Sequence, residues 1–234
     1  MYTELDQLYN MDIIRTNFNQ EKLLQELLIS NLVDSTTIKI PKSRYFDTVT
    51  DTHEHIYYLE HGIAHLSYKK KSLAVLIDHQ FIGLGTVLDF QEKTFDIQAY
   101  TECELLMFDR KQVMELLFSM QEGMLYLYLY EKDLQKTLLE KIDLLYQKGT
   151  VRLTKTFQTL CHACGDISKD GHWVSIPRCF TIKRIADMTN LSPRSVSDFS
   201  EELIAKKIIK KEAGQFIINH EKLNKLNSKN KKCN

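Results

Sequence analysis

The 234-residue chain lacks a long apolar segment, since no uninterrupted run reaches the roughly 18 residues that a membrane span needs. Its first ten residues, MYTELDQLYN, are acidic and lack the basic-then-apolar order of a signal peptide. The five cysteines are sparse and odd in number, which argues against a disulfide framework and fits a reducing compartment. We therefore expect a cytoplasmic globular protein with no membrane partner.

Motifs of the common enzyme classes are also missing. No Ser/His/Asp order, phosphate-binding loop or paired-carboxylate motif stands out, so we predict no catalytic residues. Cys161 and Cys164 form a C-x-x-C pattern, and with His172 and Cys179 nearby a zinc or redox site is an alternative. Their spacing matches no standard zinc finger, and buried thiols in a helix are common. We accordingly predict packing cysteines, no metal site and no cofactor.

The net charge of zero hides an uneven distribution. Residues 151–234 hold 16 Lys and Arg against 8 Asp and Glu, whereas residues 1–150 hold 15 against 23. Only three of the 16 positive residues lie in the tail 227–234, so the bias does not depend on that tail. A basic C-terminal third on an acidic body suits a phosphate-binding module attached to something else.

Short runs of strand-forming residues dominate the part of the chain that follows a helical N-terminal segment, 1–34. The predicted strands are residues 56–59, 63–66, 73–77, 97–100 and 104–108. Turn residues separate these runs. Many short strands at this spacing predict a β-sandwich or jelly roll.

A single long helix is predicted from about residue 109 to residue 146. Its apolar residues recur at alternating steps of three and four, a pattern typical of helices that pair in a coiled coil. The helix would span about 55 Å at 1.5 Å per residue, which is longer than a small domain needs. We favour dimerisation over packing on its own domain, and expect a hinge at 148–150. The predicted dimerisation residues are Val113, Leu117, Met120, Met124, Leu127, Leu134 and Leu138.

Residues 180–216 read as two short helices around a tight turn, followed by a β-hairpin. Thr181 can cap the first helix, and Ser192, followed by Pro193, can cap the second. Asn190 lies in the turn, where Asn tolerates the left-handed conformation. This is the layout of a winged helix-turn-helix, which places one helix in the major groove of DNA.

A β-roll, a long pairing helix, a hinge and a winged helix-turn-helix in this order resemble a Crp/Fnr-family transcription regulator. Besides the helix-turn-helix, the resemblance is carried by residues 59–64 (LEHGIA), 81–85 (FIGLG) and 99–106 (AYTECELL). It implies an α+β fold. The predicted domains are 1–108, N-terminal helices and a cyclic-nucleotide-binding-like β-roll; 109–148, dimerisation helix and hinge; 149–227, winged helix-turn-helix; and 228–234, a disordered basic tail.

The effector site departs from the pattern of the family. Members that bind cyclic AMP carry a Gly-Glu pair and, further on, an Arg followed by Ser or Thr. Here Thr86 follows Gly85, so the carboxylate is missing. Lys93 and Thr94 stand near the arginine position, so a phosphate would meet the point charge of a lysine ammonium instead of the planar, bidentate guanidinium of an arginine. With Gly83, these residues form the predicted pocket, and we expect an effector other than cyclic AMP. Residues 1–102 contain no cysteine, which argues against the iron–sulfur cluster of oxygen-sensing members.

The DNA-reading helix also departs from its relatives, which carry Arg, Glu and Arg where this chain has Pro193, Arg194 and Asp198. Arg194 is the best base-reading candidate, because Arg pairs bidentately with guanine. Asp198 either accepts from a cytosine amine or orients Arg194 through an ion pair. The predicted DNA-binding residues are Thr181, Ser192, Pro193, Arg194, Ser195, Ser197, Asp198, Lys206, Lys207, Lys210 and Lys211.

The sequence thus predicts a bacterial regulator that binds double-stranded DNA as a homodimer. Its operator would be a palindrome with half-sites one helical turn, roughly 34 Å, apart. The resemblance also makes RNA polymerase and an unidentified small-molecule effector candidate partners. The alternative is a small-molecule, redox or metal sensor whose C-terminal module engages a protein.

Overall fold

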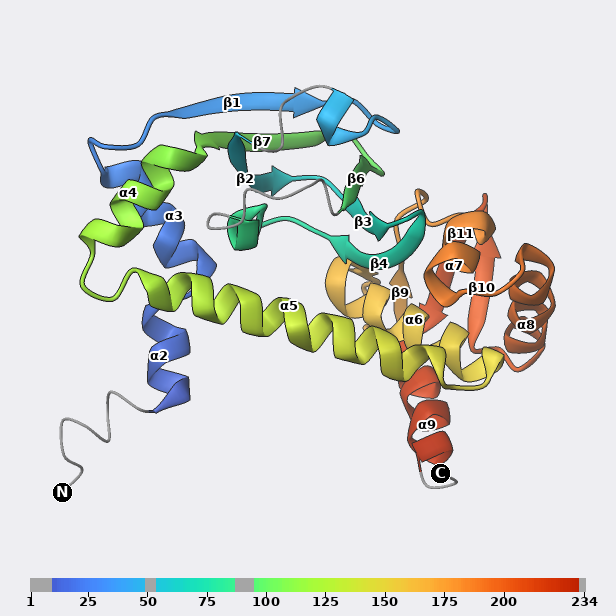
Figure 1. Cartoon of the computed structure of the whole chain (residues 1–234). Helices are drawn as coiled ribbons and strands as arrows, with labels where there is room; N and C mark the ends of the chain where they lie inside the picture. The colour runs from blue at the N-terminus through green and yellow to red at the C-terminus, as the bar shows by residue number, and fades with distance from the viewer. Residues whose placement is uncertain (1–9, 49–53, 87–94, 232–234) are drawn as a thin grey trace, which may run out of the picture. The chain divides into compact units, whose positions relative to one another are not determined.

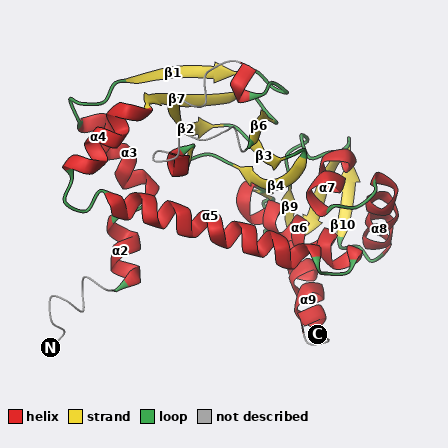
Figure 2. Cartoon of the chain, in the orientation of Figure 1, coloured by secondary structure: helices red, strands yellow, loops and turns green. Residues whose placement is uncertain are grey.

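Two compact units make up the chain in the computed structural model, which describes residues 10–48, 54–86 and 95–231 (Figure 1). The first unit comprises Met1–Lys69 and Val75–Leu138, and the second Lys70–Ala74 and Leu139–Asn234. No helix in the described ranges combines the length and the hydropathy that a membrane span requires. The first unit combines two sheets with helices, and helices make up most of the second (Figure 2).

In the described part of the first unit, helices α2 (Met11–Asn17) and α3 (Gln20–Ile29) come first and two sheets follow, although residues 71–74 of one strand count with the second unit. Antiparallel pairs give the first sheet its order β1-β7-β2-β5, and the second sheet has the order β4-β3-β6. The strands are β1 (Ser35–Ile40), β2 (His55–His61), β3 (Ala64–Tyr68), β4 (Lys71–Leu76), β5 (Gln80–Ile82), β6 (Asp96–Ala99) and β7 (Cys103–Asp109). The 3-10 turns η1 (Phe46–Thr48) and η2 (Leu84–Thr86) lie between them.

Strand β2 divides its side chains between two hydrophobic cores. Ile56 and Tyr58 pack into one core and Tyr57 and Leu59 into the other, and none of the four is more than 2% exposed. Successive side chains of a strand point to opposite faces, so both faces of this sheet are covered. The uninterrupted apolar run 56–59 is therefore a central strand.

The region 109–146 forms two helices where the sequence predicts one, so the prediction of a continuous helix is wrong. Helix α4 spans Arg110–Ser119, and α5 spans Met124–Leu145. A Cβ at Gly123 would lie 2.1 Å from the carbonyl oxygen of Leu117, so this turn between the helices needs a glycine. The apolar residues keep their heptad spacing across this turn, so the sequence pattern does not reveal the break.

The second unit contains a four-stranded sheet, of order β10-β11-β9-β8, and helices around it. Its core includes Phe157 and Phe216, whose ring centroids are 5.2 Å apart and which are at most 1% exposed. After the end of α5, the elements are α6 (Gly149–Cys164), β8 (Asp166–Ile167), β9 (Trp173–Ser175), α7 (Ile182–Thr189), α8 (Pro193–Ala205), β10 (Ile209–Glu212), β11 (Gln215–Asn219) and α9 (His220–Lys231).

Helix α9 corrects the expectation of a disordered tail from residue 228, because the helix continues to Lys231. Two buried side chains, Leu223 and Asn227, hold it against the rest of the unit. The Asn227 amide donates to Gln158 Oε1 on α6 at 2.8 Å. Residues 232–234 lie outside the described part of the chain.

Candidate nucleic-acid interface

Helix α7 has the predicted cap at each end. The Thr181 hydroxyl accepts a hydrogen bond from the Arg184 backbone N–H at 3.4 Å. At the other end, Asn190 adopts the left-handed conformation, with φ 51° and ψ 47°, and the Leu191 N–H returns to the Ala186 carbonyl at 3.0 Å. This geometry ends the helix and turns the chain toward the next one.

Helix α8 begins at the predicted position. Ser192 caps it by accepting from the Ser195 N–H at 3.0 Å, and the two hydroxyls are 2.8 Å apart. Pro193 occupies the first helical position, where its missing N–H leaves no bond unmade. Val196 and Leu203 are buried on the inner face, at 0% and 5% exposure. The opposite face of α8 is left to solvent.

Arg194 and Asp198 lie on this outer face, with side chains 92% and 62% exposed. Arg194 Nε and Asp198 Oδ2 are 4.0 Å apart, an (i, i+4) ion pair at the limit of contact. Exposed pairs of this kind contribute only about 0.3–0.5 kcal/mol. The pair therefore leaves the Arg194 guanidinium available to a ligand. Ser197, which lies between these two residues in the sequence, is half-buried.

Four exposed lysines lie on or just before the wing: Lys206 and Lys207 follow α8, and Lys210 and Lys211 are on β10. The hairpin of the wing closes through Ala213 and Gly214, whose positive φ values of 48° and 80° suit a tight two-residue turn. Lys210 Nζ lies 4.1 Å from the centre of the Trp173 ring, and Lys211 Nζ lies 5.5 Å from that of Phe216. The rings hold the lysine stems on the sheet while the charges stay at the surface.

All of the predicted DNA-binding residues thus belong to one unit and to consecutive elements, from Thr181 to Lys211. Sequence reasoning passed over two further exposed cations, Arg178 just before α7 and Lys183 on α7 itself. Their charge and their place beside the helix-turn-helix are signals that could have found them.

Side chains of α5 lie against the described part of the predicted effector pocket. Gly83 has φ 84°, and a Cβ at Gly85 would lie 1.9 Å from Glu131 Oε1. The Tyr130 hydroxyl donates to the Phe81 carbonyl at 3.4 Å, and burial raises the pKa of this phenol. Lys93 and Thr94 lie outside the described residues, and Thr86 ends η2. A hollow of about 400 Å³ beside this turn is lined by residues that include Arg15, Leu84, Tyr126 and Asp133.

The described cysteines of the second unit, Cys161, Cys164 and Cys179, are half-buried or buried. Burial raises the pKa of the Cys161 thiol to about 12, which disfavours the thiolate that redox chemistry needs. The Cys164 thiol donates to the Leu160 carbonyl at 3.5 Å within α6. Among the described residues, no three His, Cys, Asp or Glu side chains gather closely enough to hold a metal ion.

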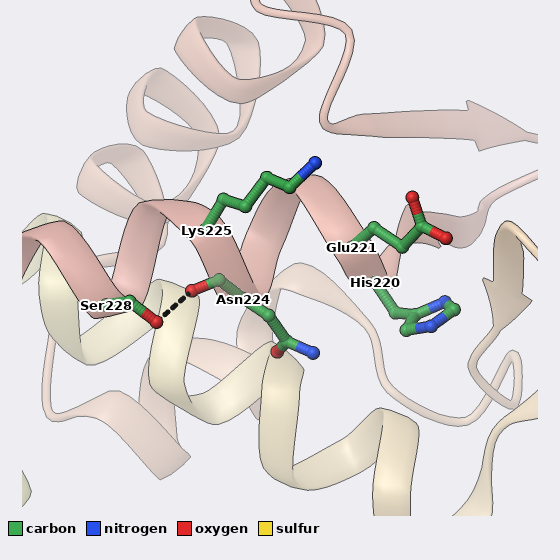
Figure 3. A pocket seen from close by; sticks show the side chains of 5 residues that line it. All are labelled: His220, Glu221, Asn224, Lys225 and Ser228. Carbon is green, nitrogen blue, oxygen red and sulfur yellow. Dashed lines mark hydrogen bonds between the residues drawn. The ribbon is translucent and has the colours of Figure 1, made fainter.

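A shallow hollow of about 580 Å³ lies on α9 (Figure 3). His220, Glu221, Asn224, Lys225 and Ser228 line it, and Ser228 Oγ donates to the Asn224 carbonyl at 2.9 Å. The lining contains one carboxylate, one amine and one imidazole, and neither a thiol nor a pair of carboxylates. This set of side chains does not form a catalytic arrangement.

The predicted dimerisation residues differ in exposure. Val113, Leu117 and Leu127 are enclosed in the core of their own unit, at most 7% exposed, so their side chains cannot meet a second copy without unpacking that core. Met120 packs against the same core, Leu134 and Leu138 are half-buried, and Met124 is 40% exposed. Besides Met124, the exposed large apolar side chains of α5 and its C-terminal neighbour are Tyr128, Leu139, Ile142, Leu145 and Tyr146.

Comparisons with known proteins agree with this architecture. Residues 38–120 match the family model of the cyclic nucleotide-binding domain. FixK2 from Bradyrhizobium japonicum is similar in structure, with a TM-score of 0.69 and 14% identity over 82% of this chain and 97% of that one. A search of curated proteins gives no match.

Two further solved structures are similar over nearly their whole length. The c-di-GMP-responsive global regulator CLP from Xanthomonas campestris has a TM-score of 0.67 and 13% identity over 85% of this chain and 98% of that one. A CRP/FNR-family transcriptional regulator from Thermus thermophilus has a TM-score of 0.67 and 15% identity, covering 82% and 98%. The resemblance read from the sequence is confirmed at the level of fold: this chain has the α+β fold of the Crp/Fnr-family transcription regulators, and its residues 38–120 are similar to the cyclic nucleotide-binding domain.

Proposed function

We propose that this protein is a DNA-binding transcription regulator that acts as a homodimer. The observation that carries the proposal is the outer face of α8, where the nearly fully exposed Arg194 stands beside a capped helix N-terminus. This face belongs to the basic part of the chain, in which 16 positive residues stand against 8 negative ones. A transcription regulator of this kind works where the DNA is, in the cytoplasm.

Each group on this surface has a role that its chemistry suits. Ser192, Ser195 and the N-terminus of α8 would hold a backbone phosphate, with Pro193 shaping that end of the helix. Arg194 would read guanine through its O6 and N7 atoms. The wing lysines, led by Lys210 and Lys211, would contact phosphates on either side of the groove. Thr181 would do the same from the start of α7.

Asp198 makes this surface selective. Its carboxylate would repel phosphate and accepts hydrogen bonds only, so it suits a cytosine amine or a role in holding Arg194. Because Pro193, Arg194 and Asp198 replace the Arg, Glu and Arg of relatives, we expect an operator different from theirs.

The second copy would pack on the exposed side of α5. Leu139, Ile142 and Tyr146 follow one another at steps of three and four, and Tyr128 lies about three helical turns before Leu139, so the four side chains share one face. A stripe of exposed apolar side chains with this spacing is typical of helix pairing. Two α8 helices would then address two half-sites of a palindrome. RNA polymerase is the partner through which such a complex would act on transcription.

The first unit would hold the effector. We expect a ligand other than cyclic AMP, because Thr86 follows Gly85 where the cyclic AMP pattern has a carboxylate. Glu131 and Tyr130 of α5 lie directly against this turn, so a ligand that moved the turn would also act on α5. Differential affinity of that ligand for two arrangements of α5 would be the source of regulation.

Selection of bound sequences from random double-stranded DNA with the purified full-length protein tests the proposal. The expected result is enrichment of a palindrome, with binding that weakens steeply as salt rises because counterions are released from DNA. Failure to enrich any sequence, with affinity insensitive to salt, would support a C-terminal module that engages protein instead.

A further inference from the structure

Two cations from outside the helix-turn-helix bind the end of α7. The Lys141 ammonium, near the C-terminus of α5, donates to the Met188 carbonyl. Arg152 Nη1, in the first turns of α6, donates to the carbonyls of Thr189 at 3.0 Å and Asn190 at 3.1 Å. The last carbonyls of a helix lack partners within the helix and carry the negative end of its dipole. Three successive carbonyls here are therefore held by positive charge.

The start of α6 also packs against α8, the helix proposed to read DNA. A Cβ at Gly149 would lie 2.9 Å from the Phe199 ring and 3.2 Å from Leu191 Cδ2. Gly149 is the first residue of α6, Leu191 lies in the turn and Phe199 is on α8. Contacts from the α5–α6 junction therefore converge on residues 188–191 and on α8 itself.

Both cations are held in a partly dry site. Burial lowers the pKa of Lys141 to about 8, and Lys141 and Arg152 are half-buried. Arg152 Nε is enclosed and has no hydrogen-bond partner in the described part of the structure. Desolvating a charge costs free energy, and the hydrogen bonds to the three carbonyls offset part of that cost.

We propose that Lys141 and Arg152 are positioning residues that fix the direction of α8 relative to the C-terminal end of α5. This inference rests on the proposed function. Because α5 would pair with the second copy, the direction of α8 relative to α5 sets the spacing and angle of the two recognition helices. Neither residue lies on α8 or the wing, so neither is assigned a DNA contact. The two residues act on operator affinity through geometry alone.

The test compares a fragment that carries the selected palindrome with one that carries a single half-site. In Lys141→Met and Arg152→Met, we expect affinity for the palindrome to fall about tenfold or more, while affinity for the half-site stays within about twofold. The slope of log affinity against log salt should not change, because no phosphate contact is removed. Arg152→Lys should restore part of the loss, since it keeps the charge without the planar fork.

Lys225→Met is the matched control, because it removes one positive charge from the exposed surface of α9 in the same unit. It should leave both affinities unchanged. The positioning role would be overturned if Lys141→Met and Arg152→Met lost equal affinity for both fragments, or if both bound the palindrome as tightly as wild type. If the wild-type protein shows no preference for the palindrome, the proposed DNA-binding function fails. The wild-type measurement therefore separates a failure of that function from a failure of the positioning role.

Discussion

Replacing Leu139 and Ile142 on α5 by lysine should convert the dimer to a monomer. The two side chains are 62% and 49% exposed in the single chain. Complete burial of such a side chain contributes about 1.5–3 kcal/mol, so covering the remaining half contributes about 1 kcal/mol for each residue. Two residues from each of two copies give about 4 kcal/mol, or about a thousandfold in the dimer dissociation constant. Repulsion between the added charges would raise this figure.

Sedimentation velocity over a range of protein concentrations measures this constant. The wild-type protein should be dimeric at micromolar concentration, where Leu139→Lys/Ile142→Lys should be monomeric with an unchanged circular dichroism spectrum. Ile167→Lys is the matched control, because Ile167 is 71% exposed but lies on β8 rather than on α5. A wild-type monomer, or a double variant that dimerises as tightly as wild type, would refute the role of this face.

Two other substitutions probe single charges. Lys210→Ala should lower the slope of log affinity against log salt by about 0.9 for each phosphate that the lysine neutralises, and an unchanged slope would remove Lys210 from the interface. Lys141→Met should change the pH dependence of unfolding. The folded chain releases the Lys141 proton near pH 8 and the unfolded chain near 10.5, so wild-type stability relative to the variant should rise by roughly 2–3 kcal/mol over that window. If urea unfolding gives the same difference in free energy of unfolding between wild type and Lys141→Met at every pH from about 7.5 to 10.5, the burial of this amine is contradicted.

The helix-turn-helix could be predicted closely because its signals are local. Thr181 and Ser192 cap through hydrogen bonds to N–H groups three residues away, and Asn190 takes up its left-handed conformation within the turn itself. Such bonds depend on residues that are neighbours in the sequence. Strands β2, β3, β4, β6 and β7 could be predicted for a similar reason, since turn residues separate them, whereas β1 and β5 were missed.

The break between α4 and α5 could not be predicted from the apolar pattern. Met120 and Met124 keep the heptad spacing across it, and the close approach of Gly123 to the Leu117 carbonyl appears only in three dimensions. The same holds for the exposed side of α5. Burial in its own core, rather than spacing, separates Leu127 from Leu139.

The contacts of Lys141 and Arg152 leave no signature in the sequence, because their acceptors are backbone carbonyls between 37 and 47 residues away. From the sequence alone, Lys141 and Arg152 would be interpreted as charged side chains exposed to solvent on two successive helices. The position of these carbonyls at the end of α7 depends on how the second unit packs.

Binding of Arg194→Ala to the selected operator and to unrelated DNA, at one fixed salt concentration, tests most directly that α8 reads sequence. Loss of a bidentate contact with guanine should cost about 1–3 kcal/mol for each half-site, and should leave affinity for unrelated DNA within about twofold to threefold. The account predicts that the preference for the operator falls with the substitution. Equal operator affinity in Arg194→Ala and the wild-type protein would contradict it.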